Sequence, residues 1–243
     1  MSEDPLRRQR RLSEEARDAH LAWLLDALEV DLVLDVGANQ GQFGRALRDL
    51  GYAGRVVSFE PAAGPRAALE DAAAADPAWD VRPWALGSAD AEAELHAVDE
   101  QTELGSLRPA SDFGRAWKDV MGRTRSETVV VRRLDGAWAD VAGDPPARRV
   151  LLKLDTQGHD LEAFRGAGDL VRAGGPVVAV LTEVALVPIY DGVPTMTEHL
   201  AELAAAGWAL AGLTPVSFDP PTLRAIELDA LLVRDPASGT MER

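Results

Sequence analysis

The 243-residue chain contains no cysteine and only two tyrosines, and aromatic residues make up 5% of it. The absence of cysteine excludes disulfides and thiolate metal sites, and nothing in the composition indicates an oxidising compartment. No apolar run reaches the roughly eighteen residues of a membrane-spanning helix, and no apolar stretch of signal length follows the N-terminus. We therefore expect a soluble, cytoplasmic protein.

Basic residues are also scarce: 25 Lys and Arg face 40 Asp and Glu, a formal charge of −15. This excess of negative charge argues against a nucleic-acid backbone or an anionic membrane as partner. The basic cluster at 7–11 is expected to be part of a solvated tail. With 47% hydrophobic residues, the length suits one core, so we expect a tail and helix in 1–30 and one domain over 31–243. The sequence does not indicate an oligomeric state.

Apolar patterning predicts strands and helices in alternation, with a first helix at 13–29 capped by Ser13. Such alternation favours a mainly parallel sheet with helices on both faces, and the last two strands, with no helix between them, predict an antiparallel edge hairpin. The segment 87–126 is expected to be irregular apart from a short strand at 94–98. The other expected strands are 32–36, 55–59, 81–85, 127–134, 150–154, 177–182, 208–213 and 226–233, and the other expected helices are 42–50, 64–75, 135–141, 160–172 and 196–206.

A short loop after the apolar run 32–36 carries the strongest functional signal. Gly37 and Gly41 lack a Cβ atom, which lets main-chain amides approach a ligand, and Asn39 tolerates a left-handed conformation. Glu60 closes the next apolar run, nineteen residues after Gly41. A carboxylate there can accept hydrogen bonds from both hydroxyls of a ribose. The pattern indicates a nucleoside-bearing cofactor on a parallel sheet.

The glycine spacing bears on which cofactor this is. Gly37, Gly41 and Gly44 give G-x3-G-x2-G rather than the G-x-G-x-x-G of dinucleotide sites, which favours a sulfonium cofactor over a pyrophosphate. A reductase of the Tyr-x3-Lys type is disfavoured, because neither tyrosine has a lysine four residues later. A glycine turn without any ligand remains the alternative.

Four carboxylates follow predicted strands: Asp35, Glu60, Asp155 and Glu183. Ligands of open α/β sheets bind beyond the carboxyl ends of the strands, so these four should share one rim. Two alternatives remain open, namely that Asp155 caps the following helix and that Glu183 pairs with an arginine.

His159 is the one histidine expected beside this rim. It is a candidate for the base that takes a proton from a hydroxyl nucleophile, or else a residue of the pocket wall. Asp155 is the candidate for orienting the nucleophile or the amine of a cofactor. Asp155, His159 and Glu183 also offer ligands that suit magnesium, but their spacing is not specific and Gln157 lacks a charge, so we expect no metal.

Four ordered motifs resemble the FkbM family of S-adenosylmethionine-dependent methyltransferases. They are Asp-Val-Gly-Ala-Asn-x-Gly at 35–41, Phe-Glu-Pro at 59–61, Leu-Lys-Leu-Asp-Thr-Gln-Gly at 152–158 and Thr-Glu-Val at 182–184. The resemblance implies a class I methyltransferase (Rossmann-like) fold with a mainly parallel seven-stranded sheet. It also implies O-methylation of a hydroxyl on a sugar, polyketide or other secondary metabolite, with S-adenosylmethionine as cofactor.

The resemblance also implies roles for individual residues. The first motif would surround the methionine part and ribose of the cofactor, Glu60 would bind the ribose hydroxyls, and Ser106 resembles a serine that precedes the substrate region. The common family form has Val-Glu-Gly where this chain has Thr-Gln-Gly at 156–158, which puts in doubt any role that requires the family glutamate. The expected cofactor set is Asp35, Gly37, Ala38, Asn39, Gly41, Phe43, Glu60, Pro61, Ala85, Leu86, Ser106 and Asp155, with Ala85 and Leu86 flanking the adenine, and the expected catalytic set is Asp155, His159 and Glu183.

The function predicted on these grounds is methyl transfer to a hydroxyl of a small-molecule acceptor. Two other classes of protein remain as alternatives: a non-catalytic protein of methyltransferase fold that binds the cofactor, and a nicotinamide oxidoreductase. The intact motif residues Asp35 and Glu60 count against the first, and the glycine spacing counts against the second.

Overall fold

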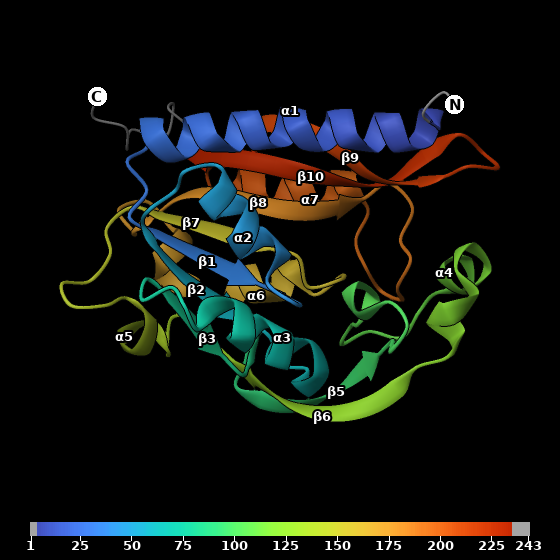
Figure 1. The fold of residues 1–243 in the computed structure, drawn as a ribbon, viewed down its shortest axis with the longest axis horizontal. Helices are drawn as coiled ribbons and strands as arrows, with labels where there is room; N and C mark the ends of the chain where they lie inside the picture. Colours follow the sequence, from blue (N-terminus) through green and yellow to red (C-terminus); the bar gives the residue numbers. More distant parts are fainter. Residues whose placement is uncertain (1–3, 235–243) are drawn as a thin grey trace.

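The computed structural model describes residues 4–234. Strands and helices alternate along most of the chain, as Figure 1 shows in sequence colours. The helices are α1 (Pro5–Ala27), α2 (Gln42–Asp49), α3 (Ala63–Ala73), α4 (Asp112–Trp117), α5 (Trp138–Val141), α6 (Asp160–Gly166) and α7 (Met196–Ala205), with short 3-10 turns η1 (Thr102–Leu104), η2 (Asp119–Gly122) and η3 (Gly168–Val171). The strands are β1 (Leu32–Val36), β2 (Arg55–Phe59), β3 (Trp79–Arg82), β4 (Ala85–Leu86), β5 (Ala91–Ala97), β6 (Arg125–Arg132), β7 (Val150–Leu154), β8 (Val177–Ala185), β9 (Trp208–Asp219) and β10 (Arg224–Arg234).

The main sheet has seven strands in the order β3-β2-β1-β7-β8-β10-β9. Its first five strands are parallel, and β10 runs antiparallel to both β8 and β9. This confirms the expected α/β class, the class I methyltransferase arrangement and the antiparallel edge hairpin. Because β1 lies at the centre, beside β2 and β7, the loops that follow these strands meet at one edge of the sheet.

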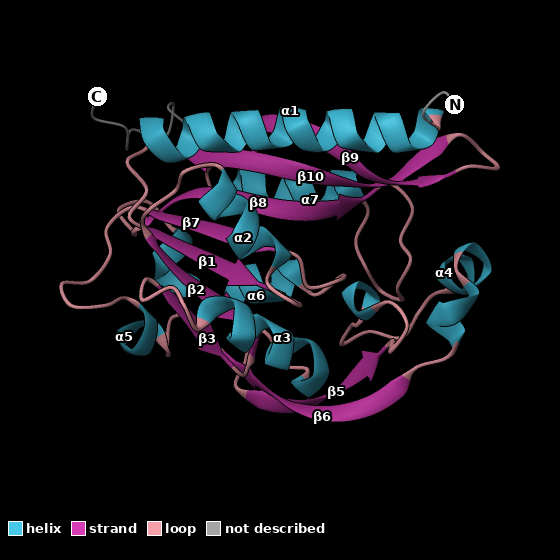
Figure 2. Cartoon of the chain, in the orientation of Figure 1, coloured by secondary structure: helices cyan, strands magenta, loops and turns pink. Residues whose placement is uncertain are grey.

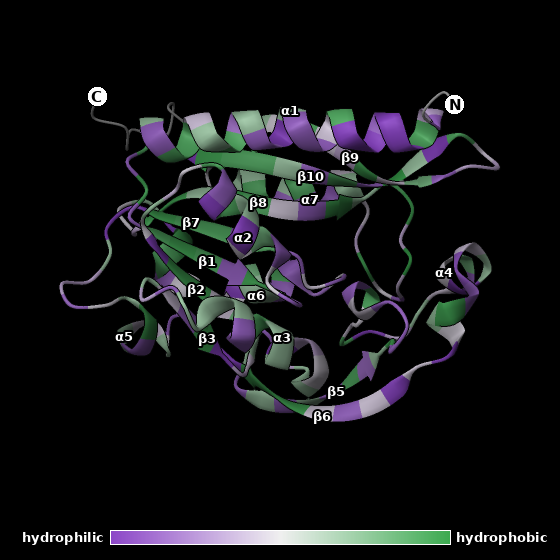
Figure 3. Cartoon of the chain, viewed as in Figure 1, coloured by the Kyte–Doolittle hydropathy of each residue, from purple (hydrophilic) through white to green (hydrophobic). Residues whose placement is uncertain are grey.

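Helices cover both faces of this sheet, as the cartoon in Figure 2 shows. Alternate side chains of each central strand enter different cores: Val33 packs with residues of α1, α2 and α3, whereas Leu32 and Leu34 pack with residues of α6 and α7. Strands β1 and β7 are buried along their whole length, which explains why both are apolar except at Asp35 and Lys153 (Figure 3). The two cores hold the central strand ends, and hence the rim, in fixed positions.

Three of the expected strands, 32–36, 55–59 and 150–154, have the predicted bounds. The strand expected at 81–85 is instead two, because Pro83 lacks the N–H that a continuous ladder requires. Its first part, β3, is an edge strand of the main sheet. Its second part, β4, belongs to a separate sheet in the order β4-β6-β5. The helix expected at 160–172 divides into α6 and η3, where Gly168 adopts a φ of +53°.

The first helix is longer than predicted. Helix α1 begins at Pro5 and is capped by Asp4, whose carboxylate accepts the Leu6 amide, whereas Ser13 lies buried inside the helix. The expectations of a Ser13 cap and of a basic tail at 7–11 were therefore wrong, since that segment is helical. The division into 1–30 and 31–243 stays a prediction. No helix within residues 4–234 is both long and apolar enough to cross a membrane.

Candidate functional site

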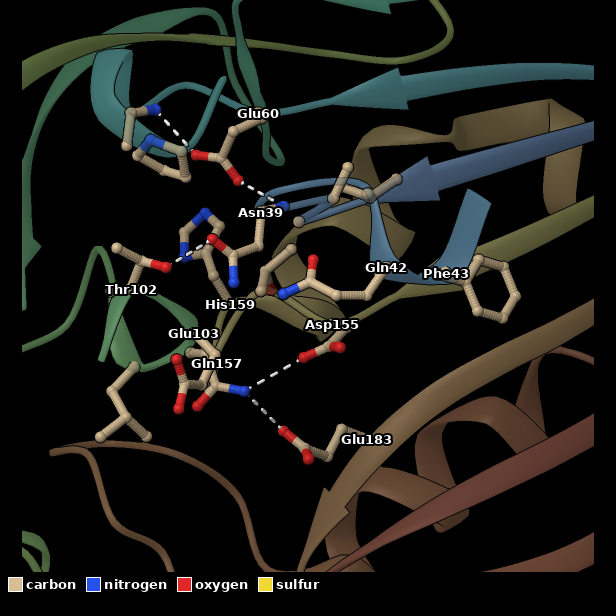
Figure 4. Close-up of a pocket in the computed structure, with 18 of the residues that line it drawn as sticks. Asn39, Gln42, Phe43, Glu60, Thr102, Glu103, Asp155, Gln157, His159 and Glu183 are labelled. Atoms are coloured by element: carbon tan, nitrogen blue, oxygen red, sulfur yellow. Dashed lines mark hydrogen bonds between the residues drawn. The ribbon is translucent and has the colours of Figure 1, made fainter. Parts of the chain in front are cut away.

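A cavity of about 830 Å³ opens at the carboxyl ends of the central strands. It lies between the main sheet, helix α1 and the segment around β5, η1 and α4, and Figure 4 shows a close-up of its wall. Most of the expected site residues line it: Gly37, Ala38, Asn39, Phe43, Glu60, Pro61, Ala85, Leu86, Asp155, His159 and Glu183. Asp35, Gly41 and Ser106 are not among the residues that line it. Residues far apart in the sequence are thus brought to one surface.

Glu60 follows β2 and holds two loops at the cavity wall. Its Oε2 accepts the Asn39 amide at 2.8 Å and its Oε1 accepts the Ala62 amide at 2.8 Å (Figure 4). Only 7% of Glu60 is exposed, and this burial raises the pKa of its carboxyl to about 7 against the lowering effect of the two amides. The carboxylate is therefore fixed in position, with its remaining acceptor capacity directed at the cavity.

The glycines of the first loop serve packing within the chain. Gly37 has a φ of +79°, and a Cβ there would lie 1.9 Å from the Asp155 carbonyl oxygen. Its amide donates to the Phe59 carbonyl at 3.0 Å and is therefore engaged within the chain, and the approach of loop amides to a ligand stays a prediction. Gly41, with a φ of +82°, precedes α2 and faces Leu69. Asn39 has a φ of +46°, the left-handed conformation that was expected.

Asp35 lies beneath the cavity floor, fully buried at the end of β1. Its Oδ1 is 2.9 Å from Lys153 Nζ, and its Oδ2 accepts the Ser58 hydroxyl at 3.1 Å. Lys153 also lies 3.3 Å from Asp155 Oδ2. Although burial opposes its charge, the carboxylates of Asp155 and Asp35 raise the pKa of Lys153, which keeps it protonated. Three of the four rim carboxylates thus line the cavity, while Asp35 fixes the lysine below them.

The side-chain amide of Gln157 connects Asp155 and Glu183. The side-chain nitrogen of Gln157 donates to Asp155 Oδ1 at 3.0 Å and to Glu183 Oε2 at 2.9 Å (Figure 4). Burial, followed by the nearby charge of Glu227, raises the pKa of Glu183 well above its ordinary value. The helix-capping alternative for Asp155 is not what the structure has, since Asp160 accepts the Thr156 and Gly158 amides there. Glu183 forms no arginine pair within the described chain.

His159 precedes α6 and lines the part of the cavity near β4. A Cβ atom on Gly87, directly after β4, would lie 3.1 Å from His159 Nε2. Burial, and then the positive charge of Arg108, lower the pKa of this imidazole, so it is neutral near pH 7. Ala85 and Leu86 line the same part of the wall. The histidine is therefore placed beside the predicted adenine region rather than beside Glu183.

Ser106 lies behind the wall instead of in it. Its hydroxyl donates to the Gln157 carbonyl at 2.7 Å and accepts the Arg108 amide at 2.9 Å. Tyr190 has a similar place, because its hydroxyl lies 2.9 Å from Gln157 Oε1 and 3.0 Å from the Leu104 carbonyl. Both residues hold the loop that carries Gln157, which has a strained φ of +54°.

Sequence reasoning missed part of the cavity wall, above all Glu227 and Asp229 of β10. The signal was present, because these two acids alternate with apolar residues and so project from one face of the strand. Other lining residues that were not predicted are Arg17, Thr102, Glu103, Trp117, Lys118, Lys153, Gln157 and Ser217. Within residues 4–234, no group of three or more metal-ligating side chains is placed to hold an ion.

Comparison with known proteins places the chain in a family. The family model of the methyltransferase FkbM domain matches residues 35–208. No curated protein matches the chain. Among solved structures, an rRNA methylase from Streptococcus thermophilus is similar at 12% identity and TM-score 0.45, covering 97% of this chain and 99% of that one. An O-methyltransferase from neocarzinostatin biosynthesis, in complex with S-adenosylmethionine, is similar at 13% identity and TM-score 0.42, covering 91% of this chain and 57% of that one. Because the family model spans well over half of its residues, this chain belongs to the FkbM methyltransferase family.

Proposed function

We propose that this protein binds S-adenosylmethionine and transfers its methyl group to a hydroxyl oxygen of a small-molecule acceptor. The observation that carries the proposal is Glu60, a buried carboxylate held by two backbone amides at the cavity wall. Family membership supports methyl transfer, and the sheet-end position of the cavity is where open α/β folds bind ligands.

The cavity wall fits this cofactor. Glu60 would accept hydrogen bonds from the two ribose hydroxyls, and Ala85 and Leu86 supply an apolar wall for the adenine. Asp155, whose charge is shared with Lys153 and Gln157, would bind the ammonium of the methionine part. The remaining members of the proposed binding set are Gly37, Ala38, Asn39, Phe43 and Pro61, which line the cavity, and Asp35, Gly41 and Ser106, which support those residues from behind.

S-adenosylmethionine, when bound, supplies an activated methyl group on a sulfonium. The chain then has two tasks: to align the acceptor hydroxyl and to remove its proton. Of the three catalytic candidates, Glu183 is best placed for the proton. It lines the cavity beside Gln157 and Asp155, and burial raises its pKa, so its ionised form is a stronger base than an ordinary carboxylate. His159 becomes a wall residue of the cofactor side, and Asp155 orients the reactants.

Transfer of an isotopically labelled methyl group tests this proposal. The protein is incubated with methyl-labelled S-adenosylmethionine and a panel of hydroxylated sugars and polyketides, and products are analysed by mass spectrometry. We expect a product carrying the label on oxygen. Label on nitrogen or carbon would contradict O-methylation, and the absence of transfer to any acceptor would favour a non-catalytic binding protein.

A further inference from the structure

Three carboxylates share one face of the sheet at the end of the cavity away from Glu60. Glu183 of β8 lies directly opposite Asp229 in the antiparallel ladder with β10. Glu227 is two residues from Asp229 along β10 and therefore projects from the same face. All three line the cavity. The register of two adjacent strands thus gathers negative charge beside the place where an acceptor would bind.

The basic side chains that line the cavity are already engaged. Arg17 lies 3.1 Å from Asp229 Oδ2 and 2.8 Å from an oxygen of Asp18. Lys153 is held by Asp35 and Asp155, and Arg125 pairs with carboxylates outside this face. Lys118 lies over the Trp117 ring, 4.6 Å from its centroid. Asp229 is therefore paired with a cation, whereas Glu183 and Glu227 form no ion pair within the described residues. The charge of Lys118 acts on Glu227 only from a longer distance.

Glu227 is the more informative of the two. It is only 7% exposed, and its Oε2 accepts the Ser217 hydroxyl at 2.8 Å. Its Oε1 has no hydrogen-bond partner, and neither Glu183 nor Glu227 forms an ion pair, within the part of the chain that the structure describes. A buried carboxylate without a positive partner is costly, and a cation from outside the chain would remove that cost.

We propose that the acceptor carries a protonated amine, which binds at Glu227 and presents a nearby hydroxyl to Glu183 for methylation. The proposal rests on the proposed function and names its substrate class, a hydroxylated organic ammonium. Burial raises the pKa values of both Glu183 and Glu227, the latter to about 7. The charge of Glu227 adds to the rise at Glu183, and the charge of Asp155 adds to the rise at Glu227. These shifts agree with the proposal, since a nearby ammonium would favour the ionised form of each carboxyl.

A divalent metal is the other cation that carboxylates bind, but the geometry disfavours it. The Gln157 amide nitrogen already donates to Glu183 and to Asp155, so a hydrogen-bond donor occupies the position between them. Described residues also offer no cluster of three metal ligands. An ammonium, with a single charge and hydrogen-bond donors of its own, needs only the free oxygen of one carboxylate, Glu227.

Calorimetry on the protein saturated with S-adenosylhomocysteine tests the proposal. Glucosamine, glucose and glucuronate serve as probes, because they share a hydroxylated ring and differ in charge. We expect glucosamine to bind at least about tenfold more tightly than glucose, and glucuronate to bind more weakly than glucose. Glu227→Gln, which keeps the shape and removes the charge, should bring the glucosamine-to-glucose ratio close to one. Asp99→Asn is the matched control, since it removes an equal charge from an exposed residue of the cavity rim, and it should keep the preference.

The outcomes separate this inference from the proposed function. Binding of S-adenosylhomocysteine with no preference for glucosamine in the wild-type protein, including no binding of any probe, overturns the amine inference and leaves the cofactor proposal intact. Failure to bind S-adenosylhomocysteine overturns the proposed function. A magnesium titration that displaces glucosamine would show that the carboxylates hold a metal ion, which also overturns the inference.

Discussion

Replacing Glu60 with Ala should weaken binding of S-adenosylhomocysteine. A hydrogen bond to a charged group is worth about 1.5–3 kcal/mol, so loss of one ribose contact lowers the affinity between tenfold and roughly 150-fold, and loss of both lowers it further. The same substitution removes the acceptor of the Asn39 and Ala62 amides, which also loosens the loop. Calorimetric titration measures the affinity, and the melting temperature shows how much of the effect is on folding.

Glu127→Ala is the matched control for this loss. Its carboxylate accepts the Ala63 amide at 3.0 Å, at the start of the same helix that follows Glu60, but Glu127 does not line the cavity. We expect it to leave the affinity nearly unchanged. Unchanged affinity in Glu60→Ala, or an equal loss in both variants, would refute the assignment of Glu60 to the ribose.

The raised pKa of Glu60 gives the same experiment a pH signature. Burial raises this pKa to about 7, and only the ionised carboxylate accepts both ribose hydroxyls. Affinity in the wild-type protein should therefore rise as pH increases through about 7 and level off above it. This rise should be absent in Glu60→Ala, and its persistence there would assign the titration to another group.

Three further results are expected. Gly37→Ala should lower the free energy of unfolding in urea by roughly 2–5 kcal/mol, because a left-handed φ and a close backbone contact both oppose a Cβ, whereas Gly51→Ala, left-handed but with open space, should cost about 1–2 kcal/mol. Lys153→Met should cost roughly 3–5 kcal/mol by leaving a buried carboxylate unpaired, and a measured loss below 1 kcal/mol would contradict the ion pair. Once an acceptor is known, Glu183→Gln should lower turnover by roughly two to four orders of magnitude and His159→Ala by far less, and the reverse order would make the histidine the base.

Local sequence was sufficient for the central sheet. Apolar runs bounded by turn residues predict β1, β2 and β7. A strand buried on both faces has a mostly apolar sequence, so its position can be predicted from that run alone. Helix α1 was the main failure at the N-terminus. Its basic residues at 7–11 are good helix formers, and the true start signal was the cap at Asp4 followed by Pro5.

The site residues that follow parallel strands could be predicted from the sequence. Those whose position depends on the pairing register of two strands could not. Glu60, Asp155 and Glu183 follow three strands, so the rule for parallel sheets brought them together. The contacts of Gln157 with two carboxylates depend on its left-handed backbone conformation. The sequence does not predict this conformation, because Gln157 is not a glycine. Glu227 required the pairing of β10 with β8, which is a non-local contact.

The central claim is that this cavity binds S-adenosylmethionine, and side-by-side calorimetry with S-adenosylhomocysteine and NAD tests it most directly. The account predicts saturable one-to-one binding of S-adenosylhomocysteine, an increase in melting temperature on binding, and no comparable binding of NAD. Tighter binding of NAD, or no binding of S-adenosylhomocysteine by a folded protein, would contradict it.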